Sequence, residues 1–576
     1  MGAARACKKQ RAAAAGAEAA DHSDTVSRLF DEVAPLLLPL LPLDARARVA
    51  CVRKAARAAA ADTSLWAELS FKLCRVRVTD EKLAALCARA GPALRTLHLH
   101  LSVKTCRRFN ASGLIAALRD GGCTSVQRIS WFSGFRQPFA LTPAQVVQLS
   151  AACPHLVLSP FTVACKNFLE AAFAAAALPG PLTLRIEGDR ASDRDEGILP
   201  MMLRRSVNCL VIRGCALSPA EMTALGVALR LNGTLTSLDL DSNIIASADV
   251  SALGEALRGN SALRTLNMRA NKIGGRGAAN LGQALLVNSA LQLLNLGDNE
   301  IGNDGAVALG AALRKNRTLK TLALSGTSIG NDGLVALSEA LCTNNMLTYL
   351  DISENRFDVV GLAALADALR ENSTLIVLNL FHCHIKTEGM ALLSDALRVN
   401  RTLEKLTLSY NSLDEAGAAA LAQVLRVNST LTFLNLAHCD IGFAGTSSLA
   451  EALRVNKTLT WLELCDNAVG AAGAVWIGEA LRASSSALTT LLLNDNGIGD
   501  GGAAALGAAL RVNRSLTRLE LADNSIEDNG AAALVEGLRV NRTLTHLDLT
   551  GHDSTAEWQT ALQEAGRLNA KLTLSL

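Results

Sequence analysis

Leucines recur along the chain at a fixed period and belong to one repeated pattern of apolar and polar positions. The clearest copy is Leu347–Asn355, which reads Leu-Thr-Tyr-Leu-Asp-Ile-Ser-Glu-Asn. Its fourth residue, which we call the anchor leucine, occurs at thirteen positions: Leu210, Leu238, Leu266, Leu294, Leu322, Leu350, Leu378, Leu406, Leu434, Leu462, Leu491, Leu519 and Leu547. Successive anchors are 28 residues apart, except for one step of 29 residues into Leu491. A period of this length predicts a repeat protein.

Each period contains a strand pattern followed by a helix pattern. Leu350 and Ile352 alternate with Tyr349 and Asp351, so an extended segment places the first two on one face and the other two on the opposite face. A glycine-rich turn follows, and then a run such as Ala306–Arg314 with apolar residues at helical spacing. One strand and one helix cannot bury their apolar faces alone, so the repeats are predicted to stack into a solenoid.

Two polar positions also recur in every part of the array. The residue five places after the anchor is Asn in eight repeats (243, 271, 299, 355, 411, 467, 496 and 524) and Cys in three (215, 383 and 439). A buried side chain there is expected to satisfy backbone groups of the loop. The second position follows the helix, where Asn316 is predicted to adopt a left-handed cap.

The sequence NRTLKTLALSGTSIGNDGLVALSEAL, residues 316–341, resembles the ribonuclease-inhibitor-type leucine-rich repeat found in NOD-like receptors and Ran GTPase-activating proteins. The resemblance implies an α/β horseshoe with parallel strands on its concave side and helices on its convex side. It covers 206–576, including a C-terminal cap. Less regular strand patterns containing Leu97, Ile129, Leu158 and Ile186 predict irregular repeats over 72–205, continuing the same sheet.

The N-terminal part of the chain does not follow the repeated leucine pattern. Residues 1–24 are rich in alanine and predict a disordered tail, and 25–71 predict a small α-helical domain. The sequence LLLPLLPLDARARVACVRKAARAAAADTSLWAELSF resembles an F-box, which docks on the Skp1-type adaptor of cullin–RING ubiquitin ligases. By this resemblance, the adaptor-binding residues are Leu36, Leu38, Leu41, Pro42, Leu65 and Trp66. The alternative is a plain helical cap over the first repeat.

Composition and charge indicate where the protein is located and which classes of partner it can bind. The net charge is only +3, which argues against nucleic acid as the main partner. Fourteen cysteines without C-x-x-C spacing, in a chain without a secretory signal, predict reduced thiols. No uncharged apolar run is long enough for a transmembrane helix, so no membrane contact is expected. We therefore predict a cytoplasmic protein, with the nucleus as the alternative, and a monomer when alone.

Three chemical motifs have structural explanations. Asn-x-Ser/Thr occurs eight times at the position of Asn316, and a ninth time at Asn110. The eight recurrent asparagines are read as parts of the repeat rather than glycosylation sites. Cys383 and Cys439 lie two repeats apart, too far for one zinc ion. The glycine-rich segment 497–502 is not followed by Gly-Lys-Ser/Thr. The sequence predicts no enzyme, no cofactor and no metal site.

The predicted concave face carries the candidate binding residues. An aromatic and imidazole group is expected on five neighbouring strands: Tyr349, Phe381, His382, Tyr410, Phe433, His438 and Trp461. An acidic stripe follows it: Glu463, Asp466, Asp495, Glu520 and Asp523. We predict that a protein ligand, one with a basic segment, docks there. The alternative is local packing between adjacent strands.

The predicted function combines the two regions of the chain. The F-box-like helices would hold the adaptor, and the solenoid would select a protein for ubiquitin transfer, as in the substrate receptor of a cullin–RING ligase. One alternative is a signalling or structural scaffold that binds no adaptor. A less favoured alternative is a GTPase-activating protein, by resemblance to the Ran GTPase-activating proteins.

Overall fold

The computed structural model describes most of the C-terminal part of the chain and short segments of the N-terminal part. In the C-terminal part it describes residues 207–483, 487–552, 556–567, 569 and 571–576. Towards the N-terminus it describes the segments 68–72, 96–101, 128–133, 161–165 and 182–187 and residues 116, 118–120 and 203. The chain divides into two compact units, one made of 1–164 and 177–182 and the other of 165–176 and 183–576. The tail 1–24 and residues 25–67 of the F-box-like segment lie outside the described residues.

Two parallel sheets are present among the described residues. The first contains three strands in the order β1 (Glu68–Lys72), β2 (Thr96–Leu101) and β3 (Arg128–Ser133). The second contains sixteen strands in sequence order from β4 (Phe161–Cys165) and β5 (Leu182–Glu187) to β19. Among the described residues, β1–β3 pair with one another, and β4 and β5 belong to the larger sheet. The continuation of one sheet through 72–205 stays a prediction.

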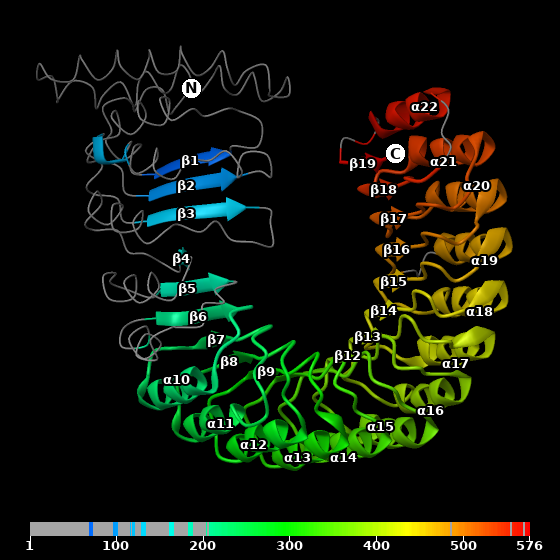
Figure 1. The fold of residues 1–576 in the computed structure, drawn as a ribbon. Helices are drawn as coiled ribbons and strands as arrows, with labels where there is room; N and C mark the ends of the chain where they lie inside the picture. The colour runs from blue at the N-terminus through cyan, green and yellow to red at the C-terminus, as the bar shows by residue number, and fades with distance from the viewer. Residues whose placement is uncertain are drawn as a thin grey trace, which may run out of the picture. The chain divides into compact units, whose positions relative to one another are not determined.

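From residue 207 onward, strands and helices alternate. The strands are β6 (Val207–Arg213), β7 (Ser237–Asp239), β8 (Thr265–Asn267), β9 (Leu293–Asn295), β10 (Thr321–Ala323), β11 (Tyr349–Asp351), β12 (Val377–Asn379), β13 (Lys405–Thr407), β14 (Phe433–Asn435), β15 (Trp461–Glu463), β16 (Thr490–Leu492), β17 (Arg518–Glu520), β18 (His546–Asp548) and β19 (Thr573–Ser575). The helices are α10 (Pro219–Leu231), α11 (Val250–Gly259), α12 (Gly275–Leu285), α13 (Gly302–Leu313), α14 (Asn331–Thr343), α15 (Val359–Glu371), α16 (Thr387–Leu397), α17 (Asp414–Val427), α18 (Gly442–Leu453), α19 (Gly470–Arg482), α20 (Gly499–Leu510), α21 (Asp528–Val540) and α22 (Ala556–Arg567). This part of the chain is a curved solenoid, with strands along the inner side of the arc and helices along the outer side (Figure 1).

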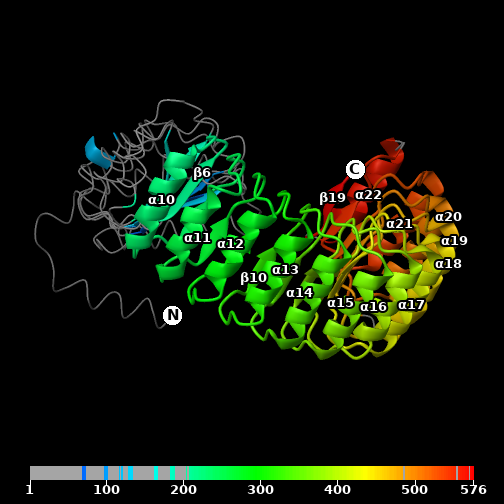
Figure 2. The same ribbon diagram turned by 60° about the horizontal axis from the view of Figure 1, so that its bottom comes forward.

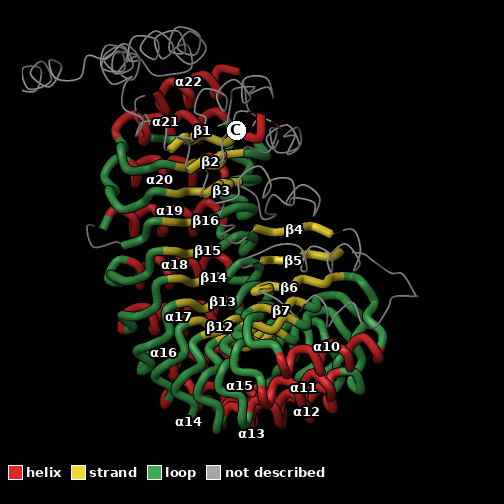
Figure 3. Tube along the Cα trace, turned by 90° about the vertical axis from the view of Figure 1, so that its left-hand side faces the viewer, coloured by secondary structure: helices red, strands yellow, loops and turns green. Residues whose placement is uncertain are grey.

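The anchor leucines hold the strands in the predicted alignment. Leu322 pairs with Leu350, and Leu350 pairs with Leu378, one period further along the chain. None of the thirteen anchors is more than 1% exposed. Figure 3 shows the resulting stack of parallel strands from β12 to β16, and Figure 2 shows the helices following one another in a single layer. The predicted register is confirmed.

Small residues let the helices of adjacent repeats approach closely. A Cβ atom added to Gly310 would lie 2.7 Å from the carbonyl oxygen of Ala336 in the next helix. Equivalent close approaches occur at Gly282 and Gly507. Side chains at these positions would push neighbouring helices apart.

The strand boundaries near the N-terminus differ from the prediction. β1 begins at Glu68, so the last four residues of the predicted helical segment 25–71 belong to a strand. A strand lies at Phe161–Cys165, whereas Leu156 and Leu158, which were expected on a strand, lie outside the described residues. The strands expected near Leu97, Ile129 and Ile186 lie where the sequence predicted.

A first asparagine ladder runs behind the strands, five residues after each anchor. The Asn411 side chain donates from Nδ2 to the carbonyl oxygens of Leu380 in the preceding repeat (2.8 Å) and of Leu408 in its own repeat (2.7 Å). Its Oδ1 accepts from the backbone N–H groups of Cys383 (3.0 Å) and Ile385 (2.9 Å). The predicted role of this position in satisfying backbone groups is confirmed.

A second asparagine ladder closes the C-terminal ends of the helices. The Nδ2 of Asn316 donates to Leu285 O (2.8 Å) and Asn288 O (3.1 Å) of the preceding repeat. Its Oδ1 accepts from the N–H groups of Thr318 and Leu319. The predicted left-handed cap is wrong, because the side chain itself satisfies these groups. The equivalent Asn344 has extended backbone angles, φ −81° and ψ 122°.

The second ladder also accounts for the glycosylation motifs. The eight asparagines, at 232, 316, 372, 400, 428, 456, 513 and 541, are at most 8% exposed. Each uses its amide nitrogen as a donor to a carbonyl group of the preceding repeat, as Asn316 does. An attached glycan would remove these bonds. Asn110 lies outside the described residues, and within them no helix is both long and apolar enough to cross a membrane.

The first ladder predicts unequal effects for two substitutions of Asn411. Asn411→Ala leaves the N–H groups of Cys383 and Ile385 and the carbonyl of Leu380 without partners, which should lower the free energy of unfolding by about 2–4 kcal/mol. Asn411→Cys should cost less, because Cys383 and Cys439 occupy this position in the flanking repeats. Urea unfolding followed by circular dichroism measures both losses. An alanine variant as stable as the wild type would contradict the assigned role of the ladder.

Candidate functional site

The first and third residues of each strand on β11–β17 face the concave side. Tyr349, Phe433 and Trp461 occupy the first position and are half-buried, whereas the anchor beside each is buried. Phe433 pairs with Trp461 across β14 and β15, and the two rings lie 5.6 Å apart at 31°. They form a continuous aromatic surface over two strands.

Tyr349 lies apart from that pair. Between β11 and β14, the same position is occupied by Val377 on β12 and Lys405 on β13. Burial and the charge of Asp351 raise the pKa of the Tyr349 phenol. In the described part of the chain, no ring contact joins Tyr349 to the other predicted aromatic and imidazole residues.

The other four predicted aromatic and imidazole residues lie in loops rather than on strands. Phe381 is three residues after its anchor, and His382, Tyr410 and His438 are four residues after theirs, beyond the strand ends. The prediction that all seven lie on strands is wrong for these four. The repeat pattern gives the positions of these four residues relative to the anchor leucines. It does not show that each strand ends after three residues.

The fourth position after the anchor has a left-handed backbone in every repeat. The residues are Gly214, Ser242, Ala270, Asp298, Gly326, Glu354, His382, Tyr410, His438, Asp466, Asp495, Asp523 and Gly551, with φ between 50° and 78°. The N–H of Tyr410 donates to Ala437 O (2.9 Å), and that of His438 to Cys465 O (2.9 Å). These bonds continue the pairing of repeats past the strands and keep the side chains in a row, which we call the loop row.

Three side chains of the loop row and Phe381 make a connected cluster. The Phe381 ring meets the edge of Tyr410 with centroids 5.1 Å apart, and Tyr410 stacks on His438 at 4.0 Å and 25°. The Nδ1 of His438 lies 2.6 Å from Oδ2 of Asp466. His382 extends the cluster, with its ring 6.0 Å from Phe381. The chain of contacts crosses four adjacent repeats.

The cluster forms the wall of a hollow on the concave side. This hollow has a volume of about 480 Å³. Phe381, Tyr410 and His438 line it together with Glu463 and Cys465. Burial and the nearby charge of Glu520 raise the pKa of Glu463, whereas the charge of His438 lowers it. Burial raises the pKa of Cys465 to about 12, so its thiol stays protonated at neutral pH.

The predicted acidic stripe is two rows rather than one. Asp466, Asp495 and Asp523 belong to the loop row and are exposed. Glu463 and Glu520 occupy the third position of β15 and β17 and are partly buried.

Part of this negative charge is balanced within the chain. The Nε of Arg518 donates to Oε1 of Glu520 at 2.9 Å, and Asn494 donates to Oε2 of Glu520 at 3.0 Å. Asp466 faces His438. The exposed carboxylates of Asp495 and Asp523 have no ion pair in the part of the chain that the structure describes.

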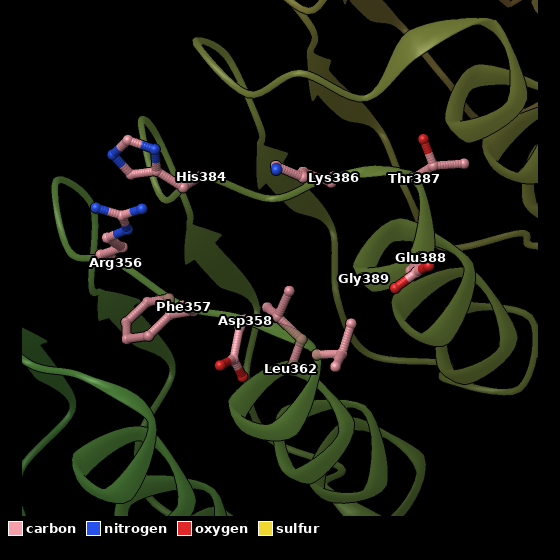
Figure 4. Close-up of a pocket in the computed structure, with 10 residues that line it drawn as sticks. Arg356, Phe357, Asp358, Leu362, His384, Lys386, Thr387, Glu388 and Gly389 are labelled. Carbon is pink, nitrogen blue, oxygen red and sulfur yellow. The ribbon is translucent and has the colours of Figure 1, made fainter.

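A second cavity lies beside the N-terminal ends of α15 and α16, and sequence reasoning did not find it. It has a volume of about 580 Å³ and includes Arg356, Asp358, His384 and Lys386 in its lining (Figure 4). Partial burial and the positive charges of Arg356, His382 and Lys386 lower the pKa of His384. Asp358 is engaged as the N-cap of α15, accepting from Val360 N at 2.8 Å. The cavity thus mixes charges of both signs.

The cysteines considered as metal ligands belong to the first ladder. Cys383 and Cys439 are fully buried, and burial raises the pKa of each thiol to about 12. Cys383 Sγ donates to Ile352 O at 3.3 Å, and Cys439 Sγ to Leu408 O at 3.2 Å. No group of three or more His, Cys, Asp or Glu side chains in the described part of the chain could hold a metal ion.

Comparison with known families identifies the repeats. The family model described as Leucine Rich repeat matches ten stretches, at residues 259–282, 287–310, 315–338, 343–366, 371–394, 399–422, 427–450, 484–507, 512–535 and 540–553. The chain is a leucine-rich-repeat protein. A search of curated proteins finds no match.

The leucine-rich repeats indicate a protein-binding module, and repeats of this family are typically non-catalytic. The matched stretches contain the whole predicted aromatic and acidic surface from Tyr349 to Asp523 except the tenth repeat, residues 451–483. The matches do not extend to the predicted F-box-like segment. Its adaptor-binding residues, Leu36, Leu38, Leu41, Pro42, Leu65 and Trp66, lie outside the described residues.

The raised pKa of Glu463 predicts the effect of Glu463→Gln on stability. A carboxyl whose pKa is higher in the folded state destabilises that state once pH rises above the unfolded pKa. We therefore expect Glu463→Gln to be more stable than the wild type at pH 7. The difference should disappear as pH falls below about 4.3, where the carboxyl is protonated in both states. Thermal unfolding across this pH range provides the measurement, and a glutamine variant less stable at pH 7 would refute it.

Proposed function

We propose that this leucine-rich-repeat protein binds a protein partner on its concave surface, through a basic segment of that partner. The observation that carries the proposal is the hollow with aromatic walls and a partly buried carboxylate, Glu463. A cationic side chain in such a hollow can lie over an aromatic ring face and pair with Glu463. The chain performs no chemistry in this proposal.

The distribution of aromatic residues supports a binding role. Aromatic residues make up only 3% of the chain, yet Phe381, Tyr410, Phe433 and Trp461 lie on four adjacent repeats. Tyr410 is 47% exposed, although its ring stacks on His438. Large aromatic side chains dominate the binding energy of many protein interfaces. The exposed part of Tyr410 is therefore available to a partner.

The carboxylates beside the cluster support a basic partner. Asp495 and Asp523 continue the loop row with exposed charges, one and two repeats beyond Asp466. Glu463 keeps a carboxylate at a partly buried position that opposes its ionisation. Complementary charge of this kind directs a partner to one part of the surface and speeds its association.

Binding of a basic peptide should depend on the concave aromatic pair. The probe is a labelled peptide of alternating Arg and Ser, about ten residues long, which can cross the seven strands β11–β17 at their usual spacing of about 4.8 Å. The double variant Phe433→Ala/Trp461→Ala should weaken binding about thirtyfold, as expected for the loss of a hot spot of about 2 kcal/mol. Fluorescence anisotropy measures the affinity.

A matched variant separates this effect from a general loss of aromatic residues. Phe443→Ala/Trp476→Ala removes one phenylalanine and one tryptophan from α18 and α19, where both are exposed. It should leave binding unchanged. Equal weakening in both double variants, or no binding by the folded wild type, would exclude the concave surface as the site for a basic segment.

A second proposal concerns residues 25–71 and rests on their resemblance to an F-box. In this proposal the N-terminal segment binds a Skp1-type adaptor, and the concave surface selects the substrate of a cullin–RING ubiquitin ligase. The supporting observation is the Leu-Pro segment around Leu41 and Pro42, followed by Leu65 and Trp66. The rival is a scaffold in which the same segment only covers the first repeat.

Adaptor binding tests this second proposal independently of the concave surface. The purified full chain should bind a Skp1-type adaptor in isothermal titration calorimetry, and Leu65→Ala/Trp66→Ala should abolish the binding. The Phe433→Ala/Trp461→Ala variant should bind the adaptor as the wild type does. A folded wild-type chain that binds no adaptor would leave the scaffold as the working function.

A further inference from the structure

A row of exposed arginine and valine residues follows the C-terminal ends of the outer helices. The sequence Arg-Val-Asn occurs at 398–400, 426–428, 454–456, 511–513 and 539–541. Its asparagine is the residue of the second ladder, which fixes the position of the preceding pair in each repeat. We call the five Arg-Val pairs the Arg-Val rim. It belongs to the opposite end of the helices from the loop row.

The exposure of the valines is not explained by folding. Val399, Val427, Val455, Val512 and Val540 are 56%, 51%, 54%, 52% and 47% exposed. In contrast, the valine in the middle of α17, Val424, is fully buried. Arginine at a helix C-terminus is favoured by the helix dipole, but the dipole gives no preference for valine. An apolar residue repeated at the same exposed position indicates a contact surface.

Further cations lie immediately after the ladder asparagine. Arg401 donates from Nη1 to Arg398 O (2.8 Å) and Asn400 O (3.0 Å), and Arg542 donates from Nη1 to Asn541 O (2.9 Å). Arg514 bonds to Asn513 O in the same way. These bonds hold the guanidinium groups against the helix ends, beside the exposed valines.

The charge of the rim is only partly balanced by acidic side chains. Arg426 lies 2.9 Å from Glu451, Arg454 lies 4.0 Å from Glu479, and Arg539 lies 2.7 Å from Glu536. All six side chains are at least 39% exposed, so these pairs are weak and can exchange for carboxylates of a partner. Together with the cations after the asparagines, the rim remains positively charged.

The spacing of the rim determines which ligand can follow it. The helices α16–α21 succeed one another along the arc (Figure 1), with axes about 8–10 Å apart for packed helices. A polypeptide in the polyproline II conformation advances about 3.1 Å per residue with three residues per turn, so every third side chain lies on the same face, about 9 Å further along. Val399, Val427 and Val455 belong to three consecutive repeats.

We propose that the Arg-Val rim binds an acidic polypeptide segment in polyproline II conformation, with an apolar residue at about every third position. The apolar residues contact the valines, and the carboxylates between them pair with the arginines. The rim segments 398–401, 426–429, 454–457, 511–514 and 539–542 contain no aromatic residue on which nucleic-acid bases could stack. A polypeptide therefore fits the rim better than a single-stranded nucleic acid does. This surface is independent of the concave site.

Binding of an acidic peptide to the full chain tests the proposal. The probe is a labelled peptide of Val-Asp-Asp repeats, about fifteen residues long, which spans five helices in polyproline II form. The triple variant Val399→Ser/Val427→Ser/Val455→Ser should weaken binding about tenfold or more by fluorescence anisotropy. The matched triple variant Val307→Ser/Val360→Ser/Val475→Ser removes three valines that are 46%, 61% and 41% exposed on other helix faces. It should bind as the wild type does.

Further probes test which chemical class of ligand binds the Arg-Val rim. A Val-Asn-Asn peptide of equal length should bind at least about tenfold more weakly, because it lacks the carboxylates. A scrambled peptide with all valines at one end should also bind more weakly. The proposal is overturned if the wild type does not bind the Val-Asp-Asp peptide, or if the two triple variants bind it equally. Stronger binding of a single-stranded oligonucleotide or of anionic lipid vesicles would overturn it in favour of those ligands.

Discussion

The solenoid depends on backbone groups that one repeat leaves unpaired and the next repeat satisfies. Asn372 illustrates this constraint, because its amide donates to the carbonyls of Leu341 and Asn344 in the repeat before it. Strands of three residues make few hydrogen bonds of their own, so the two asparagine ladders supply much of the pairing between repeats. A buried carbonyl or N–H without a partner destabilises the fold by about 1–3 kcal/mol. Stacking is therefore a requirement of polar satisfaction as well as of apolar burial.

Repeats that lack the asparagine of the first ladder show how other side chains and backbone groups take its place. In the last repeat, His552 replaces the ladder asparagine: its Nδ1 accepts from Ile526 N at 3.2 Å, and its Nε2 lies 2.9 Å from Leu521 O. Where Cys383 replaces the asparagine, the N–H of Phe357 bonds instead to the backbone carbonyl of Cys383 at 3.2 Å. The ladder position thus tolerates different side chains when the same backbone groups find partners.

The sequence predicted the parts of the fold that the period determines. The anchor leucines, the parallel register and the buried role of residues such as Asn411 all follow from a repeated local pattern. Properties that depend on where a strand ends were missed: His382, Tyr410 and His438 lie in the loop row and not on strands. Tyr349 is separated from Phe433 because two strands intervene, which a set of aromatic positions does not reveal.

Other differences between the predicted and the observed structure arise because one residue type can satisfy backbone groups in two ways. Asparagine is common both in left-handed caps and as a side-chain bridge, so the sequence alone did not distinguish these roles for Asn316. The cavity beside Arg356 and His384 is formed by consecutive loops that precede α15 and α16, and no motif marks it. Thus the period predicts the scaffold, whereas the shape of its surfaces depends on side chains brought together from successive repeats.

The same stacking gives the two ends of the helices different surfaces. Acidic residues occupy the first turn of several helices, as Asp304, Asp332 and Asp500 do, and arginines occupy the last turn of others, as Arg426 and Arg539 do. Each choice is favourable for a single helix because of its dipole. Repetition along the arc gathers the arginines into a basic edge, whereas the N-terminal ends of the helices carry charges of both signs, as Asp358 and Lys386 do. The helix dipole explains the arginines of the basic edge, but it does not explain the exposed valines beside them. The valines are therefore the reason to regard this edge as a binding surface and not only as a consequence of helix stability.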